Sequence, residues 1–385
     1  MTSRERVFST FQGTPTDKVP VAHIGFTGKA ASHILSREAF VGGGIQRWRE
    51  SVALWNGPQA HQEFLERSLN DAYELCKATG QDLLRWGYWR LGDKPVERID
   101  EFTFKYGDPD GAWWLRHYDP QTEIFEIVED RRPPAEVPRD MDELERHVRQ
   151  IQEQPVNEDA YSTTIAEASR LMERFGGEYA LRFGGGQLVI PFDQPIWLEA
   201  VAARPDLVAD YLDRQVSRRR PVLRALADAG VKLAFGGGDC ASPAGPMYSP
   251  KAFGELMLPR LKQLTDLCHR LGMHYLFGSD GNLWPIAADL FGLSGVDGYY
   301  EVDRRAGMDL NRLRDEYPDL TMVGANMSSL TLDQGTVQDV IAETRDCIET
   351  ARARGRIVVG VSNAPMPSTP PENLHAMIDT IAECR

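Results

Sequence analysis

The chain has 385 residues, which is too long for one typical sandwich or helical bundle, so it forms either two ordinary domains or one large α/β domain. Its 42% hydrophobic and 26% charged residues are typical of globular proteins and exclude a disordered, collagenous or coiled-coil chain. With 43 Lys and Arg residues against 57 Asp and Glu residues, the net charge of −14 repels a phosphate backbone and an anionic bilayer alike, so we expect neither nucleic acid nor a membrane as a partner.

The cysteines and the start of the chain indicate a reducing compartment. The five cysteines are scattered and form no Cys-x-x-Cys pair, which argues against a disulfide framework. The opening residues 1–8 are charged and amphipathic, and no apolar run approaches the roughly 18 residues of a membrane-spanning helix. We therefore expect a cytoplasmic protein.

The elements expected along the chain are alternating strands and helices. Short apolar or β-branched runs each end in Gly or a polar residue and lead into a helical stretch of about 15 to 25 residues. The predicted strands are Val19–Ile24, Gln81–Trp86, Glu178–Phe183, Val231–Phe235, Met273–Phe277, Val296–Glu301, Leu320–Val323 and Arg356–Val361. Units of this kind over the full length favour an α/β fold with a single (β/α)8 TIM barrel domain, residues 1–385, over a doubly wound sheet with an early phosphate loop.

Glycine triplets occur at Gly42–Gly44, Gly184–Gly186 and Gly236–Gly238. No Lys-Ser or Lys-Thr follows them, and no Gly-x-Gly-x-x-Gly follows the first strand, so they are not nucleotide phosphate loops. We interpret them as points of close backbone approach. Whether they act as ligand-approach loops at the barrel mouth stays open.

An insertion of about residues 94–137 separates the second and third predicted strands. Within it, Phe102–Tyr106, Trp113–Tyr118 and Thr122–Val128 alternate in polarity like a β-hairpin. We expect its aromatic side chains to pack on the barrel rim, which buries the apolar face of the insertion, in preference to contacting a ligand.

In a TIM barrel the residues just after each strand converge on one mouth, where the chemistry takes place. This rule selects three candidate catalytic carboxylates, Asp239, Asp280 and Glu301. It also selects candidate substrate-binding residues: His23, Arg85, Tyr88, Arg182, Gln187, Cys240, Ser279, Asn282, Asn326 and Asn363.

The candidate carboxylates follow neighbouring predicted strands. Asp239 comes after a glycine triplet, and Asp280 lies between two glycines in Gly278–Asn282. Because adjacent strand ends lie a few ångströms apart, Asp280 and Glu301 are expected to form a pair. Such a pair either shares a proton, which raises one pKa, or is neutralised by a metal or a cationic substrate. The alternative for Asp239 is a turn cap.

The other candidates have two interpretations each. Cys240 is either a small apolar filler or a thiolate metal ligand. Arg85 and Arg182 offer guanidinium forks for a substrate carboxylate, or else they pair with Asp239 or Glu301. The sequence leaves these alternatives open.

Several motifs resemble the uroporphyrinogen decarboxylase superfamily, which includes porphyrinogen decarboxylases and corrinoid or coenzyme M methyltransferases. The resemblance rests on the segments 3–20, Gly238–Pro250, Gly278–Asn282 and Pro370–Leu374. It covers the chain nearly end to end and implies a TIM barrel with its cleft at the carboxyl ends of the strands.

The chain departs from both branches of this superfamily. The decarboxylases have an Arg-Gln-Ala-Gly-Arg-Tyr segment after the first strand that holds propionates, whereas residues 23–29 here read His-Ile-Gly-Phe-Thr-Gly-Lys. The methyltransferases hold zinc with a His-x-Cys pair and a later Cys, and the matching positions here are Gly278, Asp280 and Asn363. Glycine and asparagine cannot supply the sulfur and nitrogen donors of a thiolate zinc site. Of the two branches, the chain nevertheless resembles the methyltransferase-like branch more closely.

The leading hypothesis from the resemblance is an enzyme, a corrinoid-linked methyltransferase (demethylase) that acts on a small methylated substrate. The alternatives are a decarboxylase of a porphyrinogen-like or other carboxylated compound, and a non-catalytic corrinoid- or tetrapyrrole-binding protein. The leading hypothesis implies a corrinoid on a partner protein and leaves a divalent metal open. The superfamily resemblance also implies a homodimer.

Overall fold

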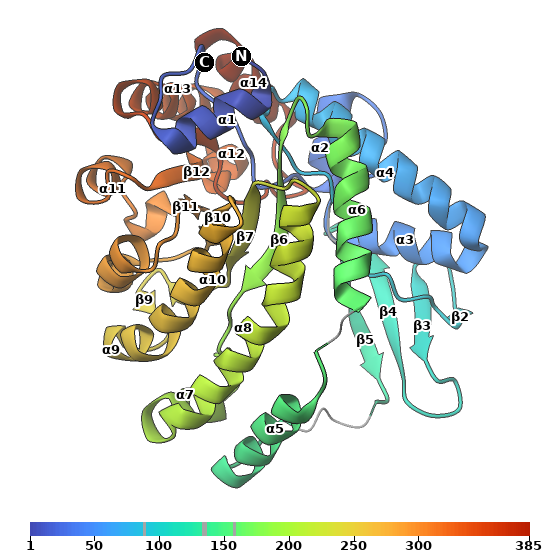
Figure 1. Cartoon of the computed structure of the whole chain (residues 1–385). Helices are drawn as coiled ribbons and strands as arrows, with labels where there is room; N and C mark the ends of the chain where they lie inside the picture. The colour runs from blue at the N-terminus through green and yellow to red at the C-terminus, as the bar shows by residue number, and fades with distance from the viewer. Residues whose placement is uncertain (88–89, 133–136, 157–158) are drawn as a thin grey trace. The chain divides into compact units, whose positions relative to one another are not determined.

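A computed structural model of the chain describes residues 1–87, 90–132, 137–156 and 159–385 (Figure 1). The chain divides into two compact units, each built from separated segments. The first unit contains Met1–Ala22, Val137–Ser328 and Cys347–Ser362, and the second contains His23–Glu136, Ser329–Asp346 and Asn363–Arg385. Each unit is described by itself.

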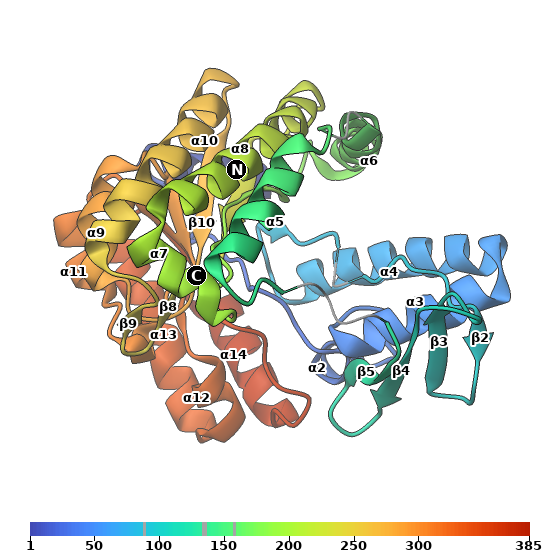
Figure 2. The same cartoon turned by 90° about the horizontal axis from the view of Figure 1, so that it is seen from below.

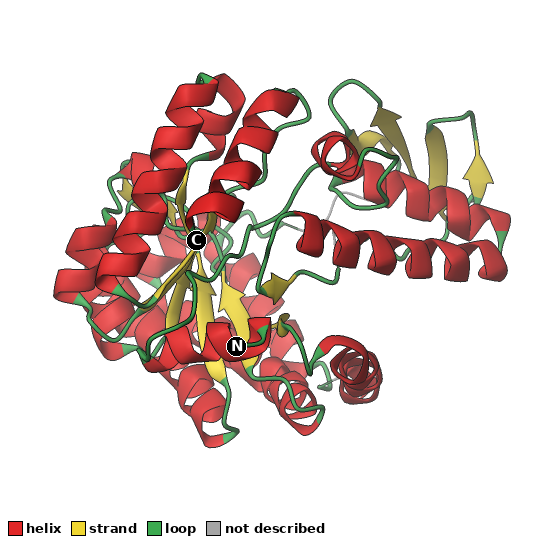
Figure 3. Ribbon diagram, turned by 90° about the horizontal axis from the view of Figure 1, so that it is seen from above, coloured by secondary structure: helices red, strands yellow, loops and turns green. Residues whose placement is uncertain are grey.

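The first unit contains a parallel sheet curled into a half-barrel, with helices around its outer face (Figure 3). Its strands, in spatial order, are β6 (Ala180–Gln187), β7 (Leu233–Gly237), β10 (His274–Gly278), β11 (Gly298–Tyr300), β12 (Thr321–Met327) and β13 (Ile357–Val361). All residues of β13 are buried, as expected for a parallel strand that is covered on both faces. The predicted α/β class and parallel sheet are therefore present.

The first unit also contains helices and short turns. They are α1 (Ser3–Gln12), α5 (Met141–Glu153), α6 (Asp159–Phe175), α7 (Pro195–Ala203), α8 (Pro205–Asp228), α9 (Pro250–Ala252), a π-helical segment (Phe253–Met257), α10 (Leu258–Arg270), a 3₁₀ turn (Trp284–Ile286), a second π-helical segment (Ala288–Leu293), a second 3₁₀ turn (Arg304–Ala306), α11 (Leu310–Glu316) and the end of α13 (Val337–Arg354). The short strands β8 (Ala241–Ser242) and β9 (Gly245–Pro246) form a small antiparallel pair.

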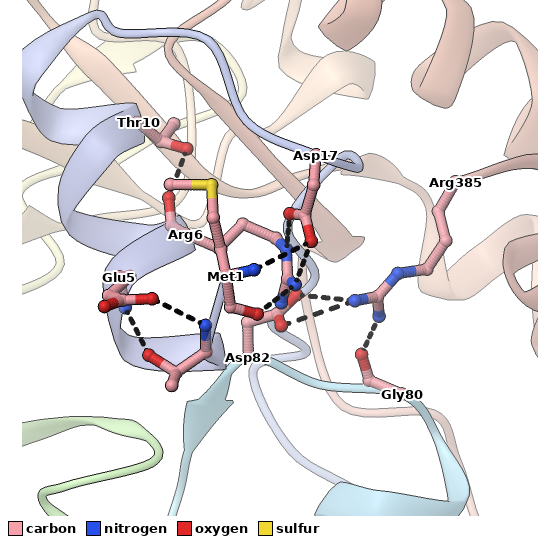
Figure 4. A network of polar contacts seen from close by, with 9 residues as sticks. Met1, Glu5, Arg6, Thr10, Asp17, Gly80, Asp82 and Arg385 are labelled. Atoms are coloured by element: carbon pink, nitrogen blue, oxygen red, sulfur yellow. Dashed lines mark hydrogen bonds and ion pairs between the residues drawn. The ribbon is translucent and has the colours of Figure 1, made fainter.

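The amino terminus of the first unit is fixed by a capping box and an ion pair (Figure 4). Glu5 N donates to Thr2 Oγ1 at 3.1 Å, and Thr2 N donates to Glu5 Oε2 at 2.8 Å. The buried Arg6 donates from Nε to Asp17 Oδ1 at 2.8 Å and thereby holds the pKa of that carboxyl well below its usual range. These contacts fasten α1 to the segment that follows it.

The second unit combines helices with an antiparallel sheet. The helices are α2 (Gly28–Leu35), α3 (Gly44–Asn56), α4 (Pro58–Ala78), α12 (Ser329–Gln334), the start of α13 and α14 (Pro371–Cys384). The strands are β1 (Leu83–Leu84) and the four of the antiparallel sheet, β2 (Glu97–Arg98), β3 (Thr103–Gly107), β4 (Trp113–Asp119) and β5 (Ile124–Asp130). The carboxyl-terminal Arg385 pairs with Asp82 at 3.1 Å within this unit (Figure 4).

The insertion contains four strands where the sequence predicted a hairpin. Its buried aromatic residues Phe104, Tyr106, Tyr118 and Phe125 form a core of their own. The indole of Trp48, on α3, stacks on Tyr118 with the ring centroids 4.8 Å apart. The aromatic face therefore packs against α3, beside β4 and β5 (Figure 2), whereas the sequence predicted packing on a barrel rim.

All three glycine triplets make room for other parts of the chain. A Cβ on Gly44 would overlap the carbonyl of Glu123. A Cβ on Gly186 or on Gly236 would overlap the ring of Tyr275, a fully buried side chain. Close backbone approach is thus explained at these positions by internal packing, and a ligand is not needed for it.

One buried carboxylate in the second unit accepts hydrogen bonds from several donors. Glu50 has no exposed side-chain surface and accepts from Arg90 Nε at 2.9 Å, from Leu91 N at 2.8 Å and from His61 Nε2 at 3.1 Å. We expect Glu50→Ala to lower the free energy of unfolding by about 3 kcal/mol, because the donors around this buried carboxylate lose their acceptor. Urea unfolding of this variant beside the exposed Glu74→Ala, which should change stability by less than about 0.5 kcal/mol, provides the check.

None of the described helices has the combination of length and apolar composition that a membrane crossing requires.

Candidate functional site

The three predicted catalytic carboxylates lie together at the carboxyl edge of the parallel sheet. In the sheet register Gly237 is opposite Gly278, and Gly278 is opposite Tyr300, so β7, β10 and β11 end at one level. Asp239, Asp280 and Glu301 follow these ends within two residues, and they offer carboxylate oxygens that all lie within 4.8 Å of one another. We call them the carboxylate trio.

The electrostatics of the trio favour a bound proton. Burial raises the pKa of Asp280 to about 6, and the negative charges of Asp239 and Asp303 add to this effect. Asp303 is held in place by backbone donors, since its Oδ1 accepts from Arg305 N and Ala306 N at 3.0 Å. Asp280 is therefore poised to exchange a proton near neutral pH.

The backbone near the trio adopts conformations that residues with a side chain rarely adopt. Glu301 has φ of +74°, in the left-handed region that is uncommon for a residue other than glycine. Gly281 has φ of +86°, and a Cβ there would lie 2.8 Å from the carbonyl of Ala241. Strained positions of this kind cluster at functional sites, so these turns agree with a site at this edge.

Comparison with known families identifies the chain. The family model "Uroporphyrinogen decarboxylase (URO-D)" matches residues 193–384, a segment that contains all three carboxylates of the trio. The chain belongs to the uroporphyrinogen decarboxylase superfamily. The resemblance noted in the sequence is thereby confirmed.

One solved structure agrees with this assignment at the level of the fold. A methyltransferase from Methanosarcina mazei has a TM-score of 0.64 and 18% sequence identity, over 100% of this chain and 99% of that chain. A D-psicose 3-epimerase, crystallised in the presence of D-fructose, has a TM-score of 0.35 and 10% identity, over 61% of this chain and 85% of that chain. A search of curated proteins finds no match.

The thiolate zinc site of the superfamily's methyltransferases does not fit the residues present. At Gly278, a Cβ would lie 2.7 Å from Cζ of Phe235, so the ring fills the space that a ligand side chain would need. Asn363 directs its Oδ1 to the backbone N of Ala364 at 2.8 Å. Within the described part of the chain, the trio is the group able to hold a metal, and its oxygen donors suit a hard divalent cation.

Cys240 is buried and lies beside Ser279, with 3.7 Å between Sγ of Cys240 and Oγ of Ser279. Burial raises the pKa of the Cys240 thiol to about 11, so the side chain stays protonated at neutral pH. Ser279 Oγ donates to the carbonyl of Asp280 at 3.0 Å, and Tyr299 Oη donates to the carbonyl of Ser279 at 3.2 Å. These contacts favour the filler interpretation of Cys240 and make Ser279 part of the frame around Asp280.

The remaining candidates in the first unit have different surroundings. Gln187 is exposed at the end of β6, and Asn282 Oδ1 accepts from Trp284 N at 3.1 Å as part of a turn. Asn326 belongs to β12, where its backbone is opposite Gly360. Arg182 lies on the concave side of the sheet, against the rings of Phe235 and Tyr300.

The described candidates in the second unit have surroundings of their own. His23 is buried, and burial lowers its pKa to about 3, so the ring is neutral. Arg85 donates to the carbonyls of Ile24 and Gly87, which are backbone acceptors. Tyr88 lies outside the described residues.

Sequence reasoning missed two aromatic rings that line the interior of the sheet. Phe235 and Tyr300 point inward, and their ring centroids are 5.6 Å apart at an interplanar angle of 76°. The signal for Tyr300 was its position directly before Glu301 at a strand end. Phe235 carries no comparable signal, because its inward direction depends on the curvature of the sheet.

Proposed function

We propose that this protein transfers a methyl group from a small methylated compound to a corrinoid carried by a partner protein. The single observation that carries the proposal is the trio, in which the pKa of Asp280 is raised to about 6 beside two further carboxylates. The structural likeness to a methyltransferase supports the fold on which such a reaction would take place.

The chemistry needs a proton at the leaving heteroatom. The reduced corrinoid supplies a cobalt(I) nucleophile that accepts the methyl group. As the bond between the methyl carbon and the heteroatom breaks, the neutral Asp280 carboxyl donates its proton to the heteroatom and becomes a carboxylate. Burial raises the pKa of Asp280, the negative charge of Asp239 adds to this effect, and Glu301 completes the acidic wall on the neighbouring strand.

The test is a direct assay with free cob(I)alamin in place of the partner protein. The purified chain is mixed with a panel of small methyl ethers, methyl thioethers and methylamines, and methylcobalamin is followed by its absorbance. We expect methylcobalamin to form from at least one donor class and only with the protein present. No formation from any donor would overturn the proposal.

A hard divalent cation is the second way to use the trio. Three carboxylates within 4.8 Å form an oxygen ligand set, and a bound cation would coordinate the leaving heteroatom in place of proton transfer from Asp280. Elemental analysis of the purified protein and titration with Mg²⁺ and Mn²⁺ separate the two roles. Tight cation binding that is lost in Asp239→Asn would assign the trio to a metal.

A decarboxylase is the alternative favoured by the matching family model. In that reaction Asp280 would protonate the carbon that loses CO2. Incubation with uroporphyrinogen and measurement of released CO2 distinguishes this function from methyl transfer.

A further inference from the structure

Arg182 on β6 is held by two aromatic rings inside the half-barrel. Its guanidinium carbon lies 4.3 Å from the ring centroid of Phe235 and 4.6 Å from that of Tyr300. Since these rings meet at 76°, they restrict the guanidinium from two directions. The two rings therefore pre-organise the Arg182 side chain.

Within the described residues, the Arg182 side chain forms neither an ion pair nor a hydrogen bond. Its Nε is sealed from solvent and has no acceptor, and the pairing with Asp239 or Glu301 that the sequence allowed is not formed. The side chain is only half-buried, so its terminal nitrogens remain accessible. A partly buried cation without a partner is costly, and an anionic ligand relieves that cost.

Open space adjoins this cation. Gly184 lies two residues further along β6, on the same face as Arg182, and a Cβ there would meet no atom within 4 Å. The guanidinium contacts Tyr300, which directly precedes Glu301 of the trio. In the sheet register Gly184 is opposite Phe235, two residues before the end of β7, so this open space lies below the level of the carboxylates.

We propose that Arg182 binds a carboxylate of the substrate, so that the substrate is a small carboxylic acid with its methyl group on a heteroatom. The position of the methyl group at the trio rests on the proposed function, whereas the anion site rests on Arg182 alone. The trio repels a carboxylate and Arg182 attracts it, so the two ends of the molecule are distinguished. The methylated end then faces the proton donor Asp280.

The experiment compares binding of charged and neutral probes by titration calorimetry. Methoxyacetate, (methylthio)acetate and N,N-dimethylglycine are each titrated beside the corresponding amide into wild-type protein, Arg182→Gln and Arg182→Lys. We expect at least one carboxylate to bind the wild type about tenfold or more tightly than its amide, with Arg182→Gln removing this difference. Arg182→Lys should retain part of it, since the charge remains while the planar fork is lost.

Arg312→Gln is the matched control. The Arg312 guanidinium also stacks on an aromatic ring, 3.6 Å from the centroid of Trp284, but this side chain is exposed on α11 and pairs with Glu316. This variant should bind the probes like the wild type. Equal Kd values for Arg182→Gln and the wild type would overturn the proposal, as would equal binding of carboxylates and amides or no binding of any carboxylate.

The result also separates this anion site from the proposed function. Arg182-dependent binding without methyl transfer from any donor would keep the site and remove the proposed reaction. Methyl transfer that depends on Asp280 and is unchanged in KM by Arg182→Gln would keep the reaction and remove the site.

Discussion

Asp280→Asn is expected to lower kcat for methyl transfer about 100-fold or more. Asparagine has nearly the same shape but cannot donate a carboxyl proton, and loss of a positioned general acid typically costs two to four orders of magnitude. The measurement is the rate of methylcobalamin formation at saturating donor. Asp266→Asn serves as the control, because Asp266 lies on α10 and pairs with Lys262 away from the trio. An unchanged kcat in Asp280→Asn would remove Asp280 from the mechanism.

The pH profile of kcat should report the same group. The pKa of Asp280 is raised to about 6, so the proton-donating form dominates below that pH and decreases about tenfold per pH unit well above it. We expect kcat of the wild type to fall as the pH rises through about 6. The residual activity of Asp280→Asn should lack this dependence.

Stability provides an independent readout of the raised pKa. Because the folded state raises the pKa of Asp280 from 3.8 to about 6, its contribution to the free energy of unfolding is fully present below 3.8 and is lost as the pH rises through about 6. With allowance for solvent exposure, the loss is about 1–2 kcal/mol. Asp280→Asn should therefore be more stable than the wild type at neutral pH, which urea unfolding at pH values on either side of 6 can measure.

Local sequence patterns were sufficient to predict most strands of the parallel sheet. Runs such as Arg356–Val361 are apolar, β-branched and bounded by turn signals, so their burial and their strand state follow from composition alone. The predicted strand Val19–Ile24 instead forms a single bridge, between Val21 and Val359. Pro20 lies inside that run and has no N–H to donate, which explains why a longer ladder is not formed.

The trio could be anticipated because strand order and strand ends are local features, and parallel register brings the ends to one level. The sequence selected Arg182 as a candidate but could not predict the direction of its side chain, because that direction depends on rings contributed by two other strands. The core of the insertion posed the same difficulty. Its aromatic alternation predicted strands, but the partner face on α3 lies far away in the sequence, and no periodicity encodes that choice.

Gly236→Ala is expected to lower the free energy of unfolding by about 3 kcal/mol, since the new methyl group would overlap the hydroxyl of Tyr275. Tyr275 cannot easily move, because it is fully buried and donates its hydroxyl to the carbonyl of Gly186. Gly184→Ala is the matched control on the neighbouring strand: its Cβ meets open space, so stability should change by less than about 0.5 kcal/mol. In urea unfolding, Tyr275→Phe should recover part of the loss when combined with Gly236→Ala. Equal effects of the two glycine replacements would contradict this account of the triplets.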